Sequence, residues 1–132
     1  LLRESDVVTL HVPLLPETEG MIGTAQLALM TPTAFLSNAS RGQVVDEQAL
    51  IEALQEGRIA GAGLDVFEKE PVALENPLLK MENVVTLPHV GSATEAPRKA
   101  MLDLAVNNVL AVLQGKPPLT PVNPEALSRL KK

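Results

Sequence analysis

The chain is divided by four short apolar runs, each of which ends at a proline or a polar loop. Runs of this length that are rich in β-branched and aliphatic residues predict buried β-strands. The runs cover residues 6–13, 33–38, 59–66 and 84–87. Glycines and alanines in 59–66 allow a neighbouring element to pack closely against that strand.

Between the second and third runs the apolar period lengthens from two residues to about 3.6, which predicts an amphipathic helix. Its apolar face consists of Ala49, Leu50, Ala53 and Leu54. Asp46 is placed to cap the N-terminus of this helix, and Gly57 is placed to end it. Thr24 would cap a shorter helix that runs through Met30.

The longest predicted helix covers residues 95–114. Pro97 is tolerated only in the first turn of a helix, which favours Thr94 as the N-cap. Almost every residue from 101 to 113 is apolar, so we expect this helix to be buried over most of its circumference. The tail, residues 115–132, holds four of the eleven prolines. We expect the tail to be extended and partly mobile.

Strands that alternate with helices and are apolar on both faces predict an α/β fold, with an open parallel sheet covered on two sides. In such sheets, ligands bind outside the carboxyl ends of the strands. The residues expected there are Val12 and Pro13, residues 39–41, Asp65, and residues 89–92. The rule therefore gathers these four places at one edge of the sheet.

The composition excludes several classes of function. The net charge is −5, and the chain has two phenylalanines but no tyrosine or tryptophan, which argues against a base-stacking nucleic-acid surface. Without cysteine there is no thiolate metal site, and we expect no metal. No apolar run could span a bilayer, so we expect a cytoplasmic protein without a membrane or nucleic-acid partner. Because a strand pattern follows closely on Leu1, which is not a methionine, we expect a fragment.

Four polar residues stand at predicted strand ends and could carry chemistry: Arg41, Asp65, Glu70 and His89. An arginine, a carboxylate and a histidine suffice to reduce a 2-keto acid. The guanidinium would bind the substrate bidentately, and the imidazolium would protonate the keto oxygen as hydride arrives. Each residue alone also has a plainer interpretation. Arg41 and Glu70 could be solvated loop residues, Asp65 a strand-end cap, and His89 a structural histidine.

These residues lie in three distinctive segments. The segments are residues 38–42 (Asn-Ala-Ser-Arg-Gly), 63–71 (Gly-Leu-Asp-Val-Phe-Glu-Lys-Glu-Pro) and 88–94 (Pro-His-Val-Gly-Ser-Ala-Thr). In sequence, order and spacing they resemble the signature segments of the D-isomer-specific 2-hydroxyacid dehydrogenases. The similarity is greatest to the glyoxylate/hydroxypyruvate reductases.

The resemblance implies a role for each residue. Arg41 would bind the substrate, His89 would be the general acid/base, and Glu70 would be the partner of the histidine. Glu68 is not chosen, because the family's carboxylate stands immediately before the proline. His11 matches no family role and is interpreted as structural. The residues expected to contact NAD or NADP are Val12, Pro13, Ala39, Ser40, Arg41, Asp65, His89, Gly91 and Ser92.

The resemblance also implies a division of the chain. Residues 1–94 would be the second half of a doubly wound, Rossmann-type NAD(P)-binding domain. Residues 95–114 would be a long helix returning towards the substrate domain, and residues 115–132 an extended tail. The sequence has no G-x-G-x-x-G turn, so we expect activity only from a complete enzyme, as a homodimer acting on a small 2-keto or 2-hydroxy acid. The alternatives are a phosphoglycerate or other D-2-hydroxyacid dehydrogenase, and a truncated non-catalytic binding or assembly module.

Overall fold

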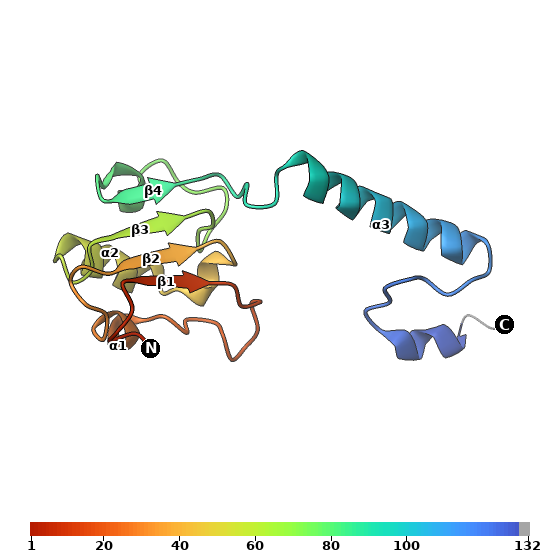
Figure 1. Cartoon of the computed structure of the whole chain (residues 1–132), viewed down its shortest axis with the longest axis horizontal. Helices are drawn as coiled ribbons and strands as arrows, with labels where there is room; N and C mark the ends of the chain where they lie inside the picture. Colours follow the sequence, from red (N-terminus) through yellow and green to blue (C-terminus); the bar gives the residue numbers. More distant parts are fainter. Residues whose placement is uncertain (130–132) are drawn as a thin grey trace. The chain divides into compact units, whose positions relative to one another are not determined.

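The computed structural model describes residues 1–129, which form two compact units that divide between Gly91 and Ser92. The first unit contains a four-stranded sheet in the order β1–β2–β3–β4, and every neighbouring pair is parallel (Figure 1). The strands are β1 (Val7–Leu10), β2 (Phe35–Asn38), β3 (Gly61–Leu64) and β4 (Val84–Thr86). The predicted α/β fold class with a parallel sheet is confirmed.

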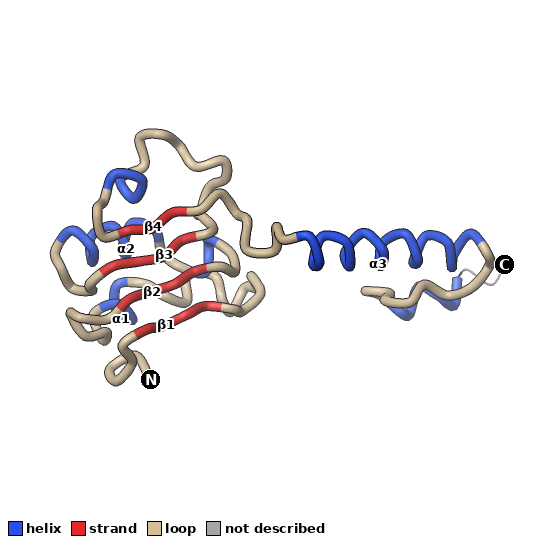
Figure 2. Tube along the Cα trace, turned by 45° about the horizontal axis from the view of Figure 1, so that its top comes forward, coloured by secondary structure: helices blue, strands red, loops and turns tan. Residues whose placement is uncertain are grey.

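Two helices, α1 (Thr24–Leu27) and α2 (Glu47–Gln55), cover one face of this sheet (Figure 2). Side chains alternate along a strand, so the buried Val8 and Leu10 of β1 face the helices while Val7 faces away. Within the first unit the opposite face is open, where Val7, Phe35 and Val85 are 61%, 51% and 68% exposed. The expectation that the sheet is covered on two sides is therefore wrong within the first unit.

The predicted ends of α2 are confirmed, whereas those of α1 are wrong. In α2, Asp46 Oδ1 accepts a hydrogen bond from the Ala49 N–H at 3.0 Å, and Gly57 follows the helix with a φ of +66°. In α1, Thr24 is the first helical residue rather than the cap, which is Gly23. This helix also ends at Leu27, because the amides of Leu29 and Met30 bond to carbonyls three residues back, in turns.

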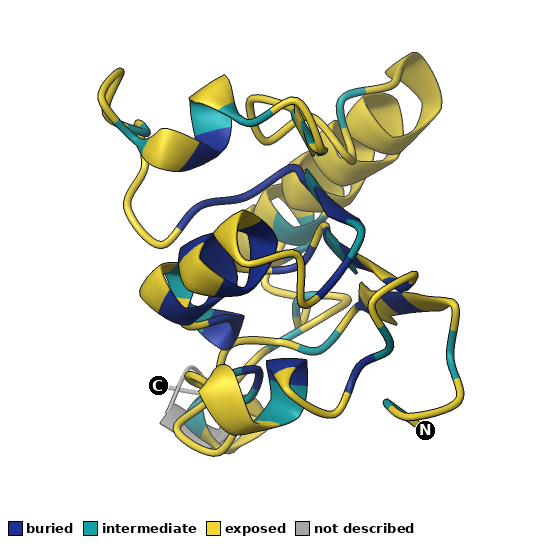
Figure 3. Cartoon of the chain, turned by 90° about the vertical axis from the view of Figure 1, so that its left-hand side faces the viewer, coloured by how far each residue is buried: buried dark blue, intermediate teal, exposed yellow. Residues whose placement is uncertain are grey.

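The second unit contains α3 (Glu95–Leu113), with Thr94 at the predicted N-cap position but without a side-chain cap bond. No residue of α3 is buried, so the expected burial is wrong (Figure 3). The tail also departs from the expected extended form, because Pro124–Arg129 is a 3-10 helix. The expectation for residues 130–132 lies outside the described residues. Within residues 1–129, no helix is long and apolar enough to cross a membrane.

Candidate functional site

The predicted site residues lie on the four loops that follow the four strands, apart from Ser92, which belongs to the second unit. Because all four strands are parallel, their carboxyl ends meet at one edge of the sheet, the edge towards which the arrows in Figure 1 point. This is the edge at which open α/β sheets bind ligands. The topology therefore gathers side chains that are up to 78 positions apart, from His11 to His89.

Glu70 and His89 form a hydrogen-bonded pair at this edge. Glu70 Oε2 lies 2.8 Å from His89 Nδ1, and Glu70 Oε1 accepts the N–H of Phe67 at 3.0 Å. The hydrogen bond from His89 and, next, that from Phe67 lower the pKa of Glu70 below its usual range. The carboxylate is then ionised at neutral pH and can only accept, so Nδ1 of His89 is the donor. Nε2 of the same ring is left to exchange a proton with a ligand.

Asp65 anchors the loop that carries His89. Its backbone carbonyl accepts the His89 N–H at 2.8 Å, and its two carboxylate oxygens accept the Val90 and Gly91 N–H groups, each at 2.7 Å. Asp65 is buried. Between these bonds the backbone of His89 takes a φ of +55°, in the left-handed region that non-glycine residues rarely adopt. The loop is therefore held in one conformation by a strand-end carboxylate, which agrees with the plainer interpretation of Asp65.

Gly91 is needed because the carboxylate of Asp65 lies close to its backbone, and its own backbone is not left-handed. A Cβ on this residue would lie 2.9 Å from Oδ2 of Asp65, closer than real Cβ contacts. The left-handed residue of the loop is His89 instead. Sequence reasoning missed this point, because the conformation depends on a carboxylate more than twenty positions away.

The loop after β2 is organised by a residue that sequence reasoning did not assign, Asn38. Its Oδ1 accepts hydrogen bonds from the N–H and the hydroxyl of Ser40, at 3.0 and 2.9 Å, and its Nδ2 donates to the carbonyl of Arg41 at 2.9 Å. Asn38 and Ser40 are both buried, whereas the Arg41 side chain is exposed and donates from Nη1 to the Ser40 carbonyl. A polar residue at the end of an apolar strand was the available signal.

Two hollows divide the predicted residues into two groups. Asp65, Glu70 and His89 line one cavity of about 440 Å³, together with Phe67, Pro71, Val72, Leu87 and Pro88. A second cavity, of about 510 Å³, is lined by His11, Val12, Pro13, Leu14, Ala39, Ser40 and Arg41. The structure therefore brings Glu70 and His89 into contact and puts Arg41 in the other group.

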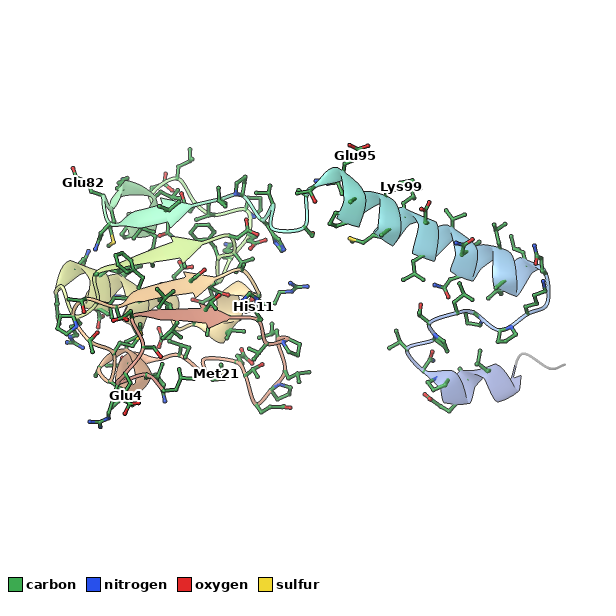
Figure 4. All side chains as sticks on the ribbon, viewed as in Figure 1. Glu4, His11, Met21, Glu82, Glu95 and Lys99 are labelled. Atoms are coloured by element: carbon green, nitrogen blue, oxygen red, sulfur yellow. The ribbon has the colours of Figure 1, made fainter. Side chains whose placement is uncertain are left out.

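His11 lies in the lining of the second cavity rather than in the core. Its side chain is exposed at the carboxyl end of β1 (Figure 4), with Nε2 3.0 Å from the hydroxyl of Thr9. Across the described residues, 1–129, no three histidine, aspartate or glutamate side chains are grouped so that they could hold a metal ion.

Comparison with known proteins gives one consistent result. Residues 1–91 match the family model of the D-isomer specific 2-hydroxyacid dehydrogenase, NAD binding domain. A glyoxylate reductase of Korarchaeum cryptofilum is 54% identical over 96% of this chain and 38% of its own length. The chain thus spans about two fifths of the length of the curated relatives that it matches.

Two solved structures are similar in fold as well as in sequence. The NADPH-dependent glyoxylate/hydroxypyruvate reductase of Sinorhizobium meliloti, in complex with NADP and malonate, has a TM-score of 0.86 and 45% identity. It is matched over 92% of this chain and 38% of its own. A protein of Ralstonia solanacearum described as a D-3-phosphoglycerate dehydrogenase has a TM-score of 0.85 and 38% identity, over 96% of this chain and 37% of its own.

Proposed function

The chain belongs to the D-isomer specific 2-hydroxyacid dehydrogenase family, and from this we propose that it is part of an enzyme that transfers a hydride between NAD(P)H and a small 2-keto acid. The observation that carries the proposal is the Glu70–His89 pair at the carboxyl edge of the sheet. A histidine that is oriented by an ionised carboxylate is a suitable general acid/base for a keto group. We expect the substrate to be glyoxylate or hydroxypyruvate, because similar proteins are named glyoxylate reductase or glyoxylate/hydroxypyruvate reductase.

The edge of the sheet has the chemistry to hold a dinucleotide. The carboxylate of Asp65 has lone pairs left after its two backbone bonds, and these can accept an amide donor such as the carboxamide of a nicotinamide. The residues proposed to hold the cofactor are Val12, Pro13, Ala39, Ser40, Arg41, Asp65, His89, Gly91 and Ser92. When bound, NADH or NADPH supplies the hydride.

The residues of this chain would supply the proton and the orientation. As the substrate carbonyl is reduced, its oxygen would take a proton from Nε2 of His89, which would give a hydroxyl group. Glu70 accepts from Nδ1 and orients the ring, so Nε2 is the nitrogen that would donate this proton. Arg41 would bind the substrate carboxylate through its planar guanidinium. In the reverse direction, the neutral imidazole takes the proton back.

The test of the general acid is His89→Ala in the complete enzyme. Turnover should fall by about 10²–10⁴-fold, the usual contribution of general acid catalysis. Cofactor binding, measured by fluorescence titration with NADH and with NADPH, should change far less than turnover, because the other proposed cofactor contacts are kept. As a matched pair of carboxylates, Glu70→Gln should lower turnover and Glu68→Gln should not. Unchanged turnover in His89→Ala would exclude the proposed role.

The test of the substrate-binding residue is Arg41→Lys. An ammonium group cannot reproduce the two parallel N–H bonds of a guanidinium, so KM for the keto acid should rise and kcat should fall. A lysine variant with the parent's kinetics would show that Arg41 only organises its loop, in keeping with its bond to the Ser40 carbonyl.

A phosphoglycerate or other D-2-hydroxyacid dehydrogenase is the second candidate, and the similarity to the Ralstonia solanacearum protein favours it. Comparing kcat/KM for glyoxylate, hydroxypyruvate and 3-phosphohydroxypyruvate, each with NADH and NADPH, separates the candidates. A non-catalytic binding module would turn over none of them. We also propose that the complete enzyme is a cytoplasmic homodimer that binds neither nucleic acid nor membrane.

A further inference from the structure

The loop that carries Glu70 is held at its start by side chains from the segment that follows Arg41. The N–H of Glu68 donates to Oε2 of Glu47 at 3.0 Å, and the carbonyl of Glu68 accepts from Nε2 of Gln43 at 2.9 Å. Both backbone polar groups of one loop residue are thus bonded to side chains that lie 21 and 25 positions earlier. Such long-range side-chain bonds to a loop peptide fix its position against the sheet helices.

Glu47 also holds the far end of the same loop. Its second carboxylate oxygen, Oε1, accepts from Nδ2 of Asn76 at 2.7 Å. Asn76 in turn accepts the N–H of Leu78 and caps the 3-10 helix Pro77–Lys80. One half-buried carboxylate therefore ties together the two ends of the loop from Glu68 to Asn76, with Glu70 between them.

The two backbones also touch directly. A Cβ on Gly42 would lie 1.9 Å from the carbonyl carbon and oxygen of Phe67, so only glycine fits there. Phe67 is the residue whose N–H bonds to Glu70. The segment that carries Arg41, residues 41–47, and the Glu70 loop are consequently in van der Waals contact at the base of the loop.

The relative position of the Glu70 and His89 side chains is not fixed by burial. The side chains of Glu70 and His89 are 37% and 47% exposed, and exposed ion pairs are weak unless their geometry is imposed from elsewhere. The geometry of Glu70 must come from its own backbone, which continues directly from Phe67 and Glu68. Those two peptides are the ones that the Gly42 contact and the two side-chain bonds hold.

We propose that Glu47 and Gln43 are positioning residues. They hold the Glu70 loop so that the Glu70 carboxylate meets His89, and they couple this loop to the segment that carries Arg41, residues 41–47. This inference rests on the proposed function for its catalytic meaning, but its geometry can be tested without turnover. Neither residue touches the cavity lined by Glu70 and His89.

The test uses Glu47→Ala and Gln43→Ala, with Glu52→Ala and Gln48→Ala as matched controls. The control pair lies on the exposed side of α2, where Gln48 Nε2 donates to Glu52 at 2.9 Å. In ¹³C NMR titrations, the pKa of the Glu70 carboxyl should rise towards 4.5 in the two positioning variants and stay at the parent value in the controls. Loss of the negative charge of Glu47 alone would lower this pKa, so a rise reports displaced hydrogen bonds.

The second readout is the exchange of the Phe67 and Glu68 amides, which should accelerate in Glu47→Ala and Gln43→Ala only. If Glu47→Ala does not fold, Glu47→Gln decides the matter, because its amide keeps one acceptor oxygen and should give an intermediate effect. A Glu70 pKa and Phe67 exchange rate equal to the parent's in every folded variant would overturn the proposal.

Kinetics of the complete enzyme separate this inference from the proposed function. Glu47→Ala should lower kcat roughly tenfold to a hundredfold, as expected when a catalytic group is displaced by about 1 Å, while KM for the cofactor changes little. If His89→Ala loses turnover but Glu47→Ala keeps the parent's kcat, the positioning role fails and the proposed function stands. If His89→Ala keeps full turnover, the proposed function fails, and the NMR measurements still decide whether Glu47 holds the loop.

Discussion

At the scale of single residues, Glu70 makes stability depend on pH. Its pKa is lowered, first by the hydrogen bond from His89 and then by that from Phe67. Above about pH 4.5 the carboxylate is ionised in the folded and unfolded chains, and its stabilisation is complete. As the pH falls below this value the unfolded chain binds the proton first, so the stabilisation is lost until the folded pKa is passed.

We therefore predict that Glu70→Gln flattens the pH dependence of unfolding on the acid side. Urea unfolding of the parent should show a falling free energy below about pH 4.5, and the glutamine variant should lack part of that fall. Glu68→Gln is the matched control and should retain it. Parallel curves for parent and Glu70→Gln would contradict the lowered pKa.

Gly42 is a position at which a side chain would clash with neighbouring backbone. Its missing side chain leaves room for the backbone of Phe67, which cannot move away as a flexible side chain could. We predict that Gly42→Ala destabilises the chain by about 1–3 kcal/mol, the usual cost of overpacking. Gly63→Ala, which would meet only Ser37 Oγ at 4.0 Å, should cost clearly less in the same denaturant titration. Equal costs would show that the Gly42 contact relaxes freely.

The sequence placed the candidate residues at one edge of the sheet, but it did not give their geometry. The pairing of Glu70 with His89 followed only from the family resemblance, since the local pattern left Glu70 as a solvated loop carboxylate. The left-handed backbone of His89 and the tie from Glu47 to Glu68 could not be foreseen. Both depend on hydrogen bonds between positions that come together only when parallel strands bring their carboxyl ends to one edge.

At the scale of elements, the sequence predicted correctly those strands and helices whose apolar pattern was bounded by clear capping or loop residues. The four apolar runs became the four strands, and α2 begins after Asp46 and ends before Gly57, as its caps predict. The predicted helix from Thr24 to Met30 was too long because Met30 is buried from a turn rather than from a helix. Pro32 follows closely and disfavours helical backbone at the residue before it. An apolar residue at helical spacing indicates that the position is buried, but a buried position can also lie in a turn.

The cap of α2 provides a test at this scale, and it also precedes Glu47 directly. Asp46→Ala removes the acceptor for the Ala49 N–H and should lower the free energy of unfolding by about 1 kcal/mol. Asp46→Asn keeps an acceptor oxygen and should lose much less, because asparagine caps helices about as well. Chemical unfolding of the two variants measures the difference. An equal loss in both would indicate that charge, rather than the cap bond, stabilises α2.

At the scale of the whole molecule, the described residues leave two apolar surfaces open, one in each unit. In the first unit it is the uncovered sheet face, with Val7, Phe35, Val85 and Leu87. In the second it is α3, where exposed apolar residues include Met101, Leu102, Val109 and Leu113. The apolar composition of α3 led to the wrong expectation of burial, because the tail covers little of this helix. Its contact with α3 includes two hydrogen bonds between Asn108 and Thr120.

Open apolar surface of this kind favours association. We predict that the purified 132-residue chain self-associates, with a sedimentation coefficient that rises with concentration. Val85→Lys puts a charge on the open sheet face, at a residue that is 68% exposed, and should weaken the association. Val122→Lys is the matched control, because that valine is 98% exposed and lies on neither surface, so the same substitution should leave association unchanged. A parent chain that stays monomeric at all concentrations would contradict the prediction, and equal effects of the two lysines would move the contact away from the sheet.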